Sequence, residues 1–356
     1  MPKDAVLIAM SGGVDSSAAA YLMQQAGYDC AGATMRLCDH ALLGYTESGN
    51  AIEDARSVAS RLGMPFHTFD NTADFRAQVV ERFIHCYEQG GTPNPCVDCN
   101  RHLKFDIFLQ KALSMGFSYI ATGHYAKIRH DPDSGRYLLY KATDTAKDQS
   151  YFLACLSQHQ LAHTLFPLGE LTKDQVRQIA EAQGFINARK KDSQDICFIP
   201  DGDYKTFMER YTGKQYPAGD FLDTEGKVVG KHAGAVGYTI GQRKGLGIAL
   251  GEPAYVCHKD MVNNTVTVGP NEALFQKTLR ADNWNWIATD NLTEPLRCKA
   301  RVRYRHTEQP ATVYPEENGL ARVEFDEPQR AITAGQAVVL YDDDMVIGSG
   351  TITETI

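Results

Sequence analysis

The sequence predicts an α/β domain built on a parallel sheet over residues 1–200, a small and mostly β domain over 201–275, and a β-barrel over 276–356. Three observations lead to this architecture. The first 35 residues read as strand, glycine-rich turn, helix and strand, which is the repeating unit of parallel sheets. After residue 200, glycines and short β-branched runs become frequent. After residue 276, short segments alternate polar and apolar side chains, as strands of small barrels do.

The elements of the first domain follow in order along the chain. Apolar runs at Ala5–Met10 and Ala31–Met35 are predicted strands, and the helical pattern Ser16–Gln25 between them ends at Gly27. Further predictions are helices over 51–62, 73–89, 104–113 and 174–182, a loop over 90–100 and a strand over 119–122. The last helix is preceded by a capping-box pattern, Thr172 with Gln175.

Composition excludes several classes of protein. Hydrophobic residues make up 43% and charged residues 22% of the 356 positions, so a disordered chain is excluded. No window approaches the about 18 consecutive apolar residues of a membrane span, and the N-terminus does not resemble a secretion signal, so we expect a cytoplasmic protein. The net charge of −8 excludes a non-specific nucleic-acid coat. Nine irregularly spaced cysteines are then expected to be thiols, ligands or catalysts rather than structural disulfides.

One segment of the predicted barrel is unusually basic. Arg297, Lys299, Arg301, Arg303 and Arg305 fall at every second position, which on a strand places all five on one face. Two interpretations stay open for this pattern: a solvated strand face, or a face that contacts phosphates.

The first chemical motif is Ser11–Ser17, with the sequence SGGVDSS, between a predicted strand and a predicted helix. Glycines let backbone N–H groups approach an anion, and the helix N-terminus adds partial positive charge, so the motif predicts a phosphate cradle. The GxxxxGK[ST] and GxGxxG patterns are absent. An ordinary glycine-rich turn is the plain alternative.

This motif resembles the PP-loop of the ATP pyrophosphatase superfamily. The resemblance implies cleavage of ATP between its α and β phosphates, with Asp15 near Mg²⁺ or pyrophosphate. The residues implied to bind ATP are Ala9, Met10, Ser11, Gly12, Gly13, Val14, Asp15, Ser16, Met35 and Gly123. Amide ligases and tRNA thiolases share this loop, so the loop alone does not choose a reaction.

The cysteines distinguish among the reactions that share this loop. Cys96 and Cys99 form a CxxC in a segment rich in Pro and Asn, which is a poor place for core packing, and Cys197 follows in KKDSQDICFIP. A thiolate accepts and releases sulfane sulfur by disulfide-exchange chemistry, so these residues suit sulfur transfer. Arg189, Lys190 and Lys191 are expected to lower the pKa of Cys197.

Six strings, in this order, resemble the tRNA-specific 2-thiouridylase family over almost the whole chain. They are TPNPCVDCNRHLKF, ATGHYAK, KDQSYFL, FPLGELTKDQVRQIA, KKDSQDICFI and YTIGQRKGLG. The resemblance implies an ATP-dependent tRNA-uridine 2-sulfurtransferase acting on C2 of the wobble uridine of tRNAs for Lys, Glu and Gln. It implies adenylation of O2, a persulfide on Cys197, Cys99 as nucleophile, a transient Cys99–Cys197 disulfide, and release of AMP and pyrophosphate.

The same resemblance implies the partners and the tRNA contacts. The partners are tRNA and a cysteine desulfurase or sulfur-relay protein, with the chain acting as a monomer. A flipped target base would lie against Asn94, Pro95 and Cys96, because a stacked uridine hides its C2. The other implied contacts are His124, Lys147, Asp148, Gln149, Arg303, Tyr304 and Gln336.

The chain departs from the family at Cys96, where many members have Asp in NPDxxC, so the acid/base role of that Asp is not carried over. Three thiols then stand where many members have two. The alternatives left open are persulfide chemistry, a [4Fe–4S] cluster held by Cys96, Cys99 and Cys197, and a zinc site with His102 as a fourth ligand. Rival functions are an amide-forming ligase and a non-enzymatic tRNA-binding or iron–sulfur protein.

Overall fold

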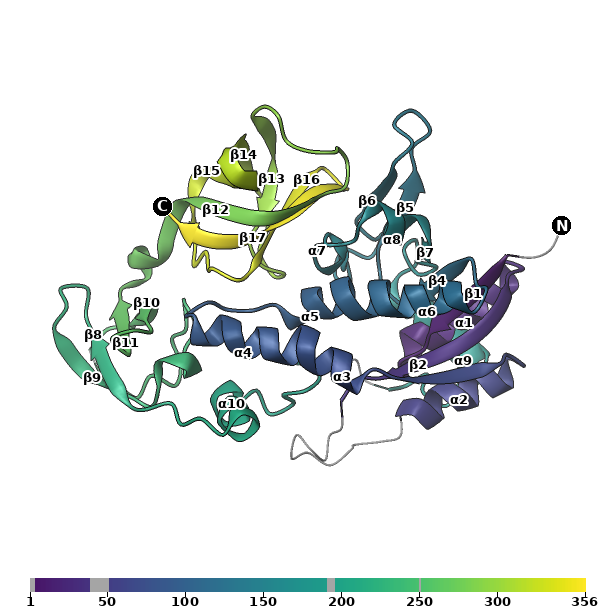
Figure 1. Cartoon of the computed structure of the whole chain (residues 1–356), viewed down its shortest axis with the longest axis horizontal. Helices are drawn as coiled ribbons and strands as arrows, with labels where there is room; N and C mark the ends of the chain where they lie inside the picture. Colours follow the sequence, from purple (N-terminus) through teal and green to yellow (C-terminus); the bar gives the residue numbers. More distant parts are fainter. Residues whose placement is uncertain (1–3, 39–50, 191–195, 250) are drawn as a thin grey trace.

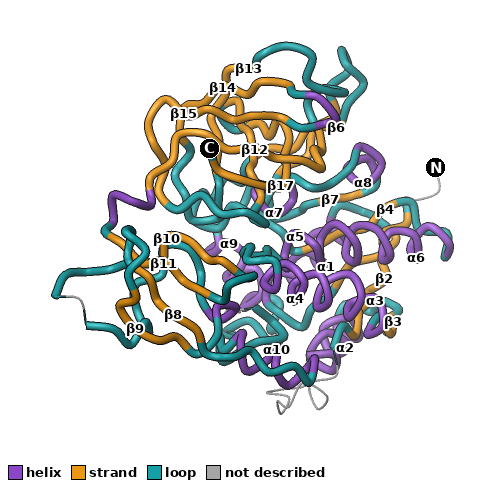
Figure 2. The backbone as a smooth tube through the Cα atoms, turned by 60° about the vertical axis from the view of Figure 1, so that its left-hand side comes forward, coloured by secondary structure: helices purple, strands orange, loops and turns teal. Residues whose placement is uncertain are grey.

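The structure of the chain is a computed structural model that describes residues 4–38, 51–190, 196–249 and 251–356. Figure 1 shows three parts: helices around a sheet that holds the N-terminus, a small β-rich part at the opposite end, and a barrel above both that carries the C-terminus. Figure 2 shows that the helices gather in the first part and the strands dominate the other two. The predicted fold class is confirmed.

The first part is built on a five-stranded parallel sheet in the order β3-β2-β1-β4-β7. Val6 and Ile8 of β1 point to one face and Leu7 to the other, and all three are fully buried, because both faces of the sheet are covered. α1 and α2 pack on one face, and η2 and α6 pack on the other. The strands are β1 (Ala5–Ala9), β2 (Asp29–Arg36), β3 (Phe66–Asp70), β4 (Tyr119–Thr122) and β7 (Thr164–Leu165).

The predicted helices of this part are present, but the helix before residue 104 and the short helices at 150–153 and 158–162 were not predicted. They are α1 (Val14–Gln25), α2 (Ala51–Arg61), α3 (Thr72–Phe75), η1 (Arg76–Val80), α4 (Glu81–Glu88), α5 (Pro95–Asp98), η2 (Cys99–Ile107), α6 (Phe108–Ser114), α7 (Ser150–Leu153), α8 (Gln158–Ala162) and α9 (Lys173–Ala182). The capping box of Thr172 with Gln175 is present at the start of α9.

The predicted loop over 90–100 is wrong in its second half, because a helix begins at Pro95 and runs without a break through η2 into α6. Proline suits this first helical position, since its missing N–H would have no partner there. Cys99 opens η2, which is π-helical over Cys99–Ile107. Extended π-helix is rare and is often found at functional sites.

The middle part is a four-stranded sheet in the order β10-β11-β8-β9, preceded by one helix. Its elements are α10 (Tyr204–Thr212), β8 (Gly219–Leu222), β9 (Val228–His232), η3 (Ala235–Gly237), β10 (Tyr255–Asp260), β11 (Thr265–Gly269) and η4 (Asn271–Leu274). Phe221, Val256 and Val266 form its own small core.

The last part is a closed antiparallel barrel, because β12 pairs with both β15 and β17. The hairpin β5 (Lys127–His130) and β6 (Tyr137–Tyr140) of the first part extends this sheet at β17. The barrel elements are β12 (Phe275–Trp286), β13 (Leu296–Arg301), β14 (Gln309–Pro315), η5 (Glu317–Gly319), β15 (Ala321–Arg330), β16 (Ala337–Asp342) and β17 (Met345–Thr355).

The basic strand is shorter than predicted. β13 ends at Arg301, and Arg303 and Arg305 lie in the turn after it, so the five cations do not share one strand face. On the strand itself Arg297 is paired with Asp326 and Lys299 with Asp343 (3.2 Å). Carboxylates of neighbouring loops and strands therefore neutralise most of this face.

Candidate active site

The loop between β1 and α1 has the geometry of an anion cradle. Gly12 has φ +72°, and a Cβ there would lie 2.3 Å from the carbonyl oxygen of Ala51, so only glycine fits without a shift. The Ser16 hydroxyl accepts from the Ser11 amide (3.2 Å) and donates to the Gly13 carbonyl (3.1 Å). The Asn187 amide donates to the Gly12 carbonyl (3.1 Å) and holds the loop from outside.

The N-terminus of α1 is left available for a ligand. Gly13 is its N-cap and provides no side-chain hydrogen bond, so the first backbone amides and the helix dipole face outward. Gly123, at the end of β4, packs against this helix start, and a Cβ on it would lie 2.7 Å from the Ser16 nitrogen. The Ser11–Ser17 motif and Gly123, far apart in sequence, therefore lie side by side.

Asp15 has two partners that sequence reasoning did not identify. Lys173 Nζ lies 2.8 Å from both carboxylate oxygens of Asp15, and the Tyr125 hydroxyl donates to one of them at 2.8 Å. Lys173 is 8% exposed. The sequence offered one clue to the position of Lys173. It is the first residue after Thr172 in FPLGELTKDQ, and the capping box of Thr172 with Gln175 fixes where α9 begins.

The three candidate sulfur-handling thiols lie near enough to influence one another electrostatically. Cys99 is 7% exposed, whereas Cys96 and Cys197 are exposed to solvent, and all three are free thiols in the structure. Their charges act on one another: besides desolvation, a thiolate at Cys99 or Cys96 raises the pKa of Cys197. Phe198 anchors the Cys197 segment by edge-to-face packing against Phe83, with ring centroids 5.4 Å apart.

Although Cys96 and Cys197 reach the surface, the protein atoms packed around all three thiols desolvate a thiolate and favour the protonated form. This desolvation raises the pKa of Cys96 and Cys99, and together with the neighbouring thiols Cys99, Cys38 and Cys96 it raises that of Cys197 to about 12. The expectation that Arg189 and Lys190 would lower this pKa is wrong. Arg189 pairs with Glu181 (3.3 Å) and Lys190 with Asp54 (2.8 Å) instead. Lys191 lies outside the described residues.

Lys104 is a cation whose charge acts on both the three thiols and His124. It partly offsets the desolvation that raises the pKa of Cys96, Cys99 and Cys197, and it adds to the desolvation that lowers the pKa of His124. The ring of Phe105, the next residue on η2, lies 5.5 Å from the ring of His124. Gly123, the residue before His124, packs against the start of α1, so η2 and the phosphate cradle meet at this loop.

The described residues do not form a ready metal site. No group of three or more His, Cys, Asp or Glu side chains in the described part of the chain is close enough to hold a metal ion. His102 does not join the thiols, since it lines a separate cavity. The three thiols do not have the spacing of a ligand set, so no step of the reaction is assigned to a cluster or a zinc ion.

Predicted tRNA contacts in the first part fall into two groups. Asn94 precedes α5, Pro95 is buried and Cys96 is exposed, at the start of α5. Asp148, by contrast, is 5% exposed and accepts hydrogen bonds from the Ala142 amide (3.0 Å) and the Ser150 hydroxyl (2.8 Å). Its position favours ordering of the 142–150 loop over direct contact with tRNA.

The neighbouring residues of this loop are also held in place. Gln149 accepts from the Tyr125 amide (3.0 Å), and Lys147 is partly buried. Desolvation and then Lys104 lower the pKa of His124, so its ring is neutral at pH 7, and the Thr122 hydroxyl lies 2.7 Å from His124 Nδ1.

The three predicted contacts from the barrel lie at its edge toward the first part. Tyr304 packs on Phe152, with ring centroids 4.4 Å apart, and Arg303 donates to the Arg330 carbonyl at 2.9 Å. Gln336 does not point to solvent: its amide donates to the carbonyls of Thr92 (2.9 Å) and Pro93 (3.1 Å).

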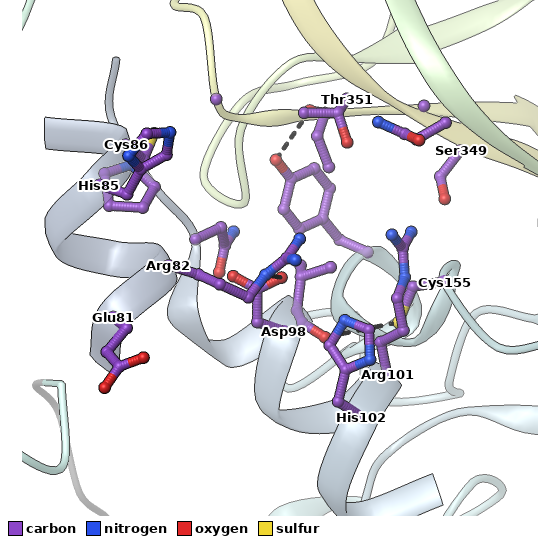
Figure 3. Close-up of a pocket in the computed structure, with 18 of the residues that line it drawn as sticks. Glu81, Arg82, His85, Cys86, Asp98, Arg101, His102, Cys155, Ser349 and Thr351 are labelled. Carbon is purple, nitrogen blue, oxygen red and sulfur yellow. Dashed lines mark hydrogen bonds and ion pairs between the residues drawn. The ribbon is translucent and has the colours of Figure 1, made fainter. Parts of the chain in front are cut away.

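A cavity of about 770 Å³ separates the helices of the first part from the barrel. Figure 3 shows Arg82 and Arg101 directed into it from the helices, with Ser349 and Thr351 on the strand above. Arg82 lies 3.4 Å from the Asp98 carboxylate, whose pKa is raised by desolvation. Asn94 and Val97 line this cavity, but Cys96 and Cys99 do not.

Three family models match the chain in succession. They are described as the tRNA methyl transferase HUP domain (residues 4–201), the tRNA methyl transferase PRC-barrel domain (205–270) and the aminomethyltransferase beta-barrel domain (276–352). Proteins named tRNA-specific 2-thiouridylase MnmA from Clostridioides difficile and Acetivibrio thermocellus are each 48% identical to this chain. The alignments cover 99% of this chain and 98% and 100% of those proteins.

The chain belongs to the tRNA-specific 2-thiouridylase family. Membership makes it a tRNA-modifying sulfurtransferase with a PP-loop, as the sequence motifs predicted. A similarly named protein from Moorella thermoacetica is 48% identical, over 97% of this chain and 98% of that one. Similarity to solved structures is weaker: an NMN synthetase from Francisella tularensis gives a TM-score of 0.36 at 16% identity, covering 61% of this chain and 80% of that one. Among the described helices, none has the length and apolar character needed to cross a membrane.

Proposed function

We propose that this chain replaces O2 of the wobble uridine of tRNAs for Lys, Glu and Gln by sulfur, using ATP. The observation that carries the proposal is that three thiols share the influence of Lys104, on a helix whose Phe105 packs on His124, next to the Gly123 that packs against the phosphate cradle at the start of α1. A phosphate site alone suits many reactions, and thiols alone suit redox chemistry. Together they suit activation of an oxygen followed by its displacement by sulfur.

In the first step, O2 of the uridine attacks the α phosphorus of ATP, and the bond to the β phosphate breaks to release pyrophosphate. The amides at the start of α1 and the Ser11 and Ser16 hydroxyls bind the phosphates. Mg²⁺ bound with ATP would neutralise phosphate charge, and the Asp15 carboxylate is the loop's oxygen donor for it. Lys173, now paired with Asp15, places a second positive charge beside the leaving pyrophosphate.

In the second step, sulfur displaces AMP from C2. A desulfurase or relay protein first transfers sulfane sulfur to Cys197, which is accessible from solvent. The Cys99 thiolate then attacks the Cys197 sulfur, the persulfide bond breaks, and hydrosulfide attacks C2 while AMP leaves. The products are 2-thiouridine, AMP and a Cys99–Cys197 disulfide, which an external thiol reductant restores.

The Cys99 and Cys197 thiols must lose their protons for this step to proceed. Desolvation favours neutral Cys99 and Cys197 at pH 7, so a base or a counter-charge is needed when the thiolate forms. Lys104 supplies the counter-charge, since its charge opposes the desolvation that raises the pKa of both thiols. We assign Lys104 to stabilising the thiolate and the negative charge that develops on the adenylated base.

The tRNA is proposed to lie across the first part and the barrel. Asn94, Pro95 and Cys96 receive the flipped base, and Arg303 and Tyr304 contact the tRNA from the barrel edge. Local contacts of this kind suit an acidic protein that selects a folded RNA by shape, with the chain acting as a cytoplasmic monomer.

The test of this function is tRNA-dependent turnover of ATP. Purified protein is incubated with ATP, unmodified tRNA and a persulfide donor, and AMP, pyrophosphate and 2-thiouridine are measured. We expect the three products in equal amounts and no AMP without tRNA. Absence of 2-thiouridine with an active donor, or AMP formed on an amide-ligase substrate instead, would overturn the proposal.

A cluster-dependent variant of the reaction is tested separately. Iron and acid-labile sulfide are measured in protein purified without oxygen, beside Cys96→Ala and, as control, Cys257→Ala in the middle part. Near-stoichiometric cluster lost only in Cys96→Ala would assign Cys96, Cys99 and Cys197 as ligands. Negligible iron after anaerobic reconstitution leaves the persulfide route.

A further inference from the structure

The segment Gly90–Asn94, which leads into the thiol-bearing helix, is held by side chains from both other parts of the molecule. Its carbonyl groups at residues 91, 92 and 93 accept hydrogen bonds from Lys259 and Gln336. Two residues later the chain reaches Cys96. The placement of α5 therefore depends on contacts outside its own domain.

The barrel holds the segment through three hydrogen bonds. The Thr92 amide donates to the Ala334 carbonyl (2.8 Å), and the Gln336 side chain donates to the Thr92 (2.9 Å) and Pro93 (3.1 Å) carbonyls. One side-chain amide thus bridges two consecutive peptide groups, which fixes their orientation as well as their position.

The middle part holds the segment through a buried cation. Lys259 is 7% exposed, and its ammonium donates to the carbonyls of Gly91 (3.3 Å) and Tyr238 (2.9 Å) and lies 5.6 Å from the centre of the Tyr87 ring. Among the described residues no carboxylate pairs with it. Because burying a cation without a counter-ion is costly, its retention here is better explained by position than by stability.

The junction is packed too closely for its members to move separately. A Cβ on Gly91 would lie 2.8 Å from Cys86 Sγ, and a Cβ on Gly335 would lie 2.5 Å from the same sulfur and 3.1 Å from the Thr92 carbonyl. Shifts of the barrel loop that carries Gly335 and Gln336 must therefore displace the segment before α5.

We propose that Gln336 and Lys259 are positioning residues that set the thiol-bearing helix according to how the barrel and the middle part sit on the first. A tRNA that lies across the first part and the barrel fixes their relative placement, and the hydrogen bonds of Gln336 and Lys259 to the Gly91–Pro93 carbonyls carry that placement to Cys96 and Cys99. The inference deepens the proposed function and depends on it only for the role of the thiols. It also gives Gln336 a task other than contact with tRNA.

The test compares Gln336→Ala with the matched control Gln309→Ala, whose amide bonds only within the barrel, to the Thr307 carbonyl (3.4 Å). Three quantities are measured: the dissociation constant for tRNA, kcat and KM for thiolation, and the rates at which iodoacetamide alkylates Cys96 and Cys99. For Gln336→Ala we expect kcat to fall about tenfold or more, because misplaced reacting groups are costly, with tRNA affinity near that of the unmodified chain.

Alkylation is the readout that a purely structural or a tRNA-contacting role would not produce. We expect Gln336→Ala to alkylate faster at Cys96 and Cys99 and to lose the protection that tRNA binding gives, while Gln309→Ala behaves as the unmodified chain. Lys259→Met, with the same stem length and no charge, should show the same changes, and the double variant should add little to either.

Three outcomes would overturn the inference. Weakened tRNA binding with unchanged kcat and unchanged alkylation would make Gln336 a tRNA contact. If the alkylation rates and kcat equal those of the control, Gln336 and Lys259 have no positioning role. Additive effects of the two variants would show independent contacts. Alkylation does not require turnover, so failure of the proposed function leaves this result interpretable.

Discussion

The two ends of the proposed active site are built in different ways. At the phosphate end, the Ser11–Ser17 loop, Gly123, Asn187 and Lys173 all belong to the first part, and backbone geometry forms the site. At the thiol end, Cys96 and Cys99 lie on a helix whose entry is held by the barrel and the middle part, and Cys197 arrives on another segment. The phosphate end is preformed, whereas the geometry of the thiol end depends on domain placement.

The largest expected effects come from removing the sulfur-carrying thiols. Cys99→Ala and Cys197→Ala should each abolish 2-thiouridine, because each thiol forms or breaks a sulfur bond in the proposed reaction. tRNA affinity and tRNA-dependent pyrophosphate exchange should persist, since the phosphate end is independent. Cys257→Ala, distant in the middle part, should remain active; measurable thiolation by either active-site variant would remove the assigned role.

The next largest effects concern the preformed end. Asp15→Asn and Lys173→Met should lower tRNA-dependent AMP formation by about 10²–10³-fold, as loss of a charged group at the reacting phosphate does elsewhere. Persulfide loading of Cys197 should be unchanged in both. Asp174→Asn, exposed on the same turn of α9, is the control; loss of persulfide loading in Lys173→Met would show that the two ends are coupled.

The pH dependence of Cys197 alkylation tests the electrostatics of the thiol end. Desolvation and the neighbouring thiols raise the pKa of Cys197 to about 12, so its thiolate fraction should rise about tenfold per pH unit between pH 7 and 10, and the rate should follow. Lys104→Met removes the cation that lowers this pKa, so the alkylation rate at pH 8 should fall. A rate that levels off near neutral pH would contradict the raised pKa.

The smallest effect is expected at the barrel edge. Arg303→Gln should weaken tRNA binding modestly and reduce the slope of log Kd against log salt by about 1, as loss of one phosphate contact does. Arg297→Gln is the matched control, because that guanidinium is already paired with Asp326. Equal salt slopes for the two variants would show that Arg303 does not contact a tRNA phosphate.

Local sequence signals were sufficient for the phosphate end. Glycine spacing, the first strand and helix, and the capping box at Thr172 each depend on nearby residues, and the structure confirms those elements. The start of α5 was missed because Gly, Pro and Asn before Cys96 are typical of a loop, although Pro95 is also a good first helical residue. The basic strand was overextended because alternation of charge does not show where a strand ends.

Tertiary contacts explain what the sequence could not supply. Lys173 meets Asp15 across 158 positions, and Gln336 meets Thr92 across 244, so no window contains either pair. The pKa of Cys197 was predicted in the wrong direction because desolvation, which the sequence does not show, raises it, while Arg189 and Lys190 pair with Glu181 and Asp54 instead. Basic residues that are close to Cys197 in sequence were therefore a poor guide to the charges that act on its thiol.

The most direct test of the account is a single turnover with iron-free protein persulfidated at Cys197. ATP and unmodified tRNA are added without further donor, and the products are counted by mass spectrometry. We predict one 2-thiouridine and one AMP for each persulfide consumed, with a Cys99–Cys197 disulfide left behind. No 2-thiouridine until an iron–sulfur cluster is rebuilt on the protein would contradict the persulfide route at the thiol end.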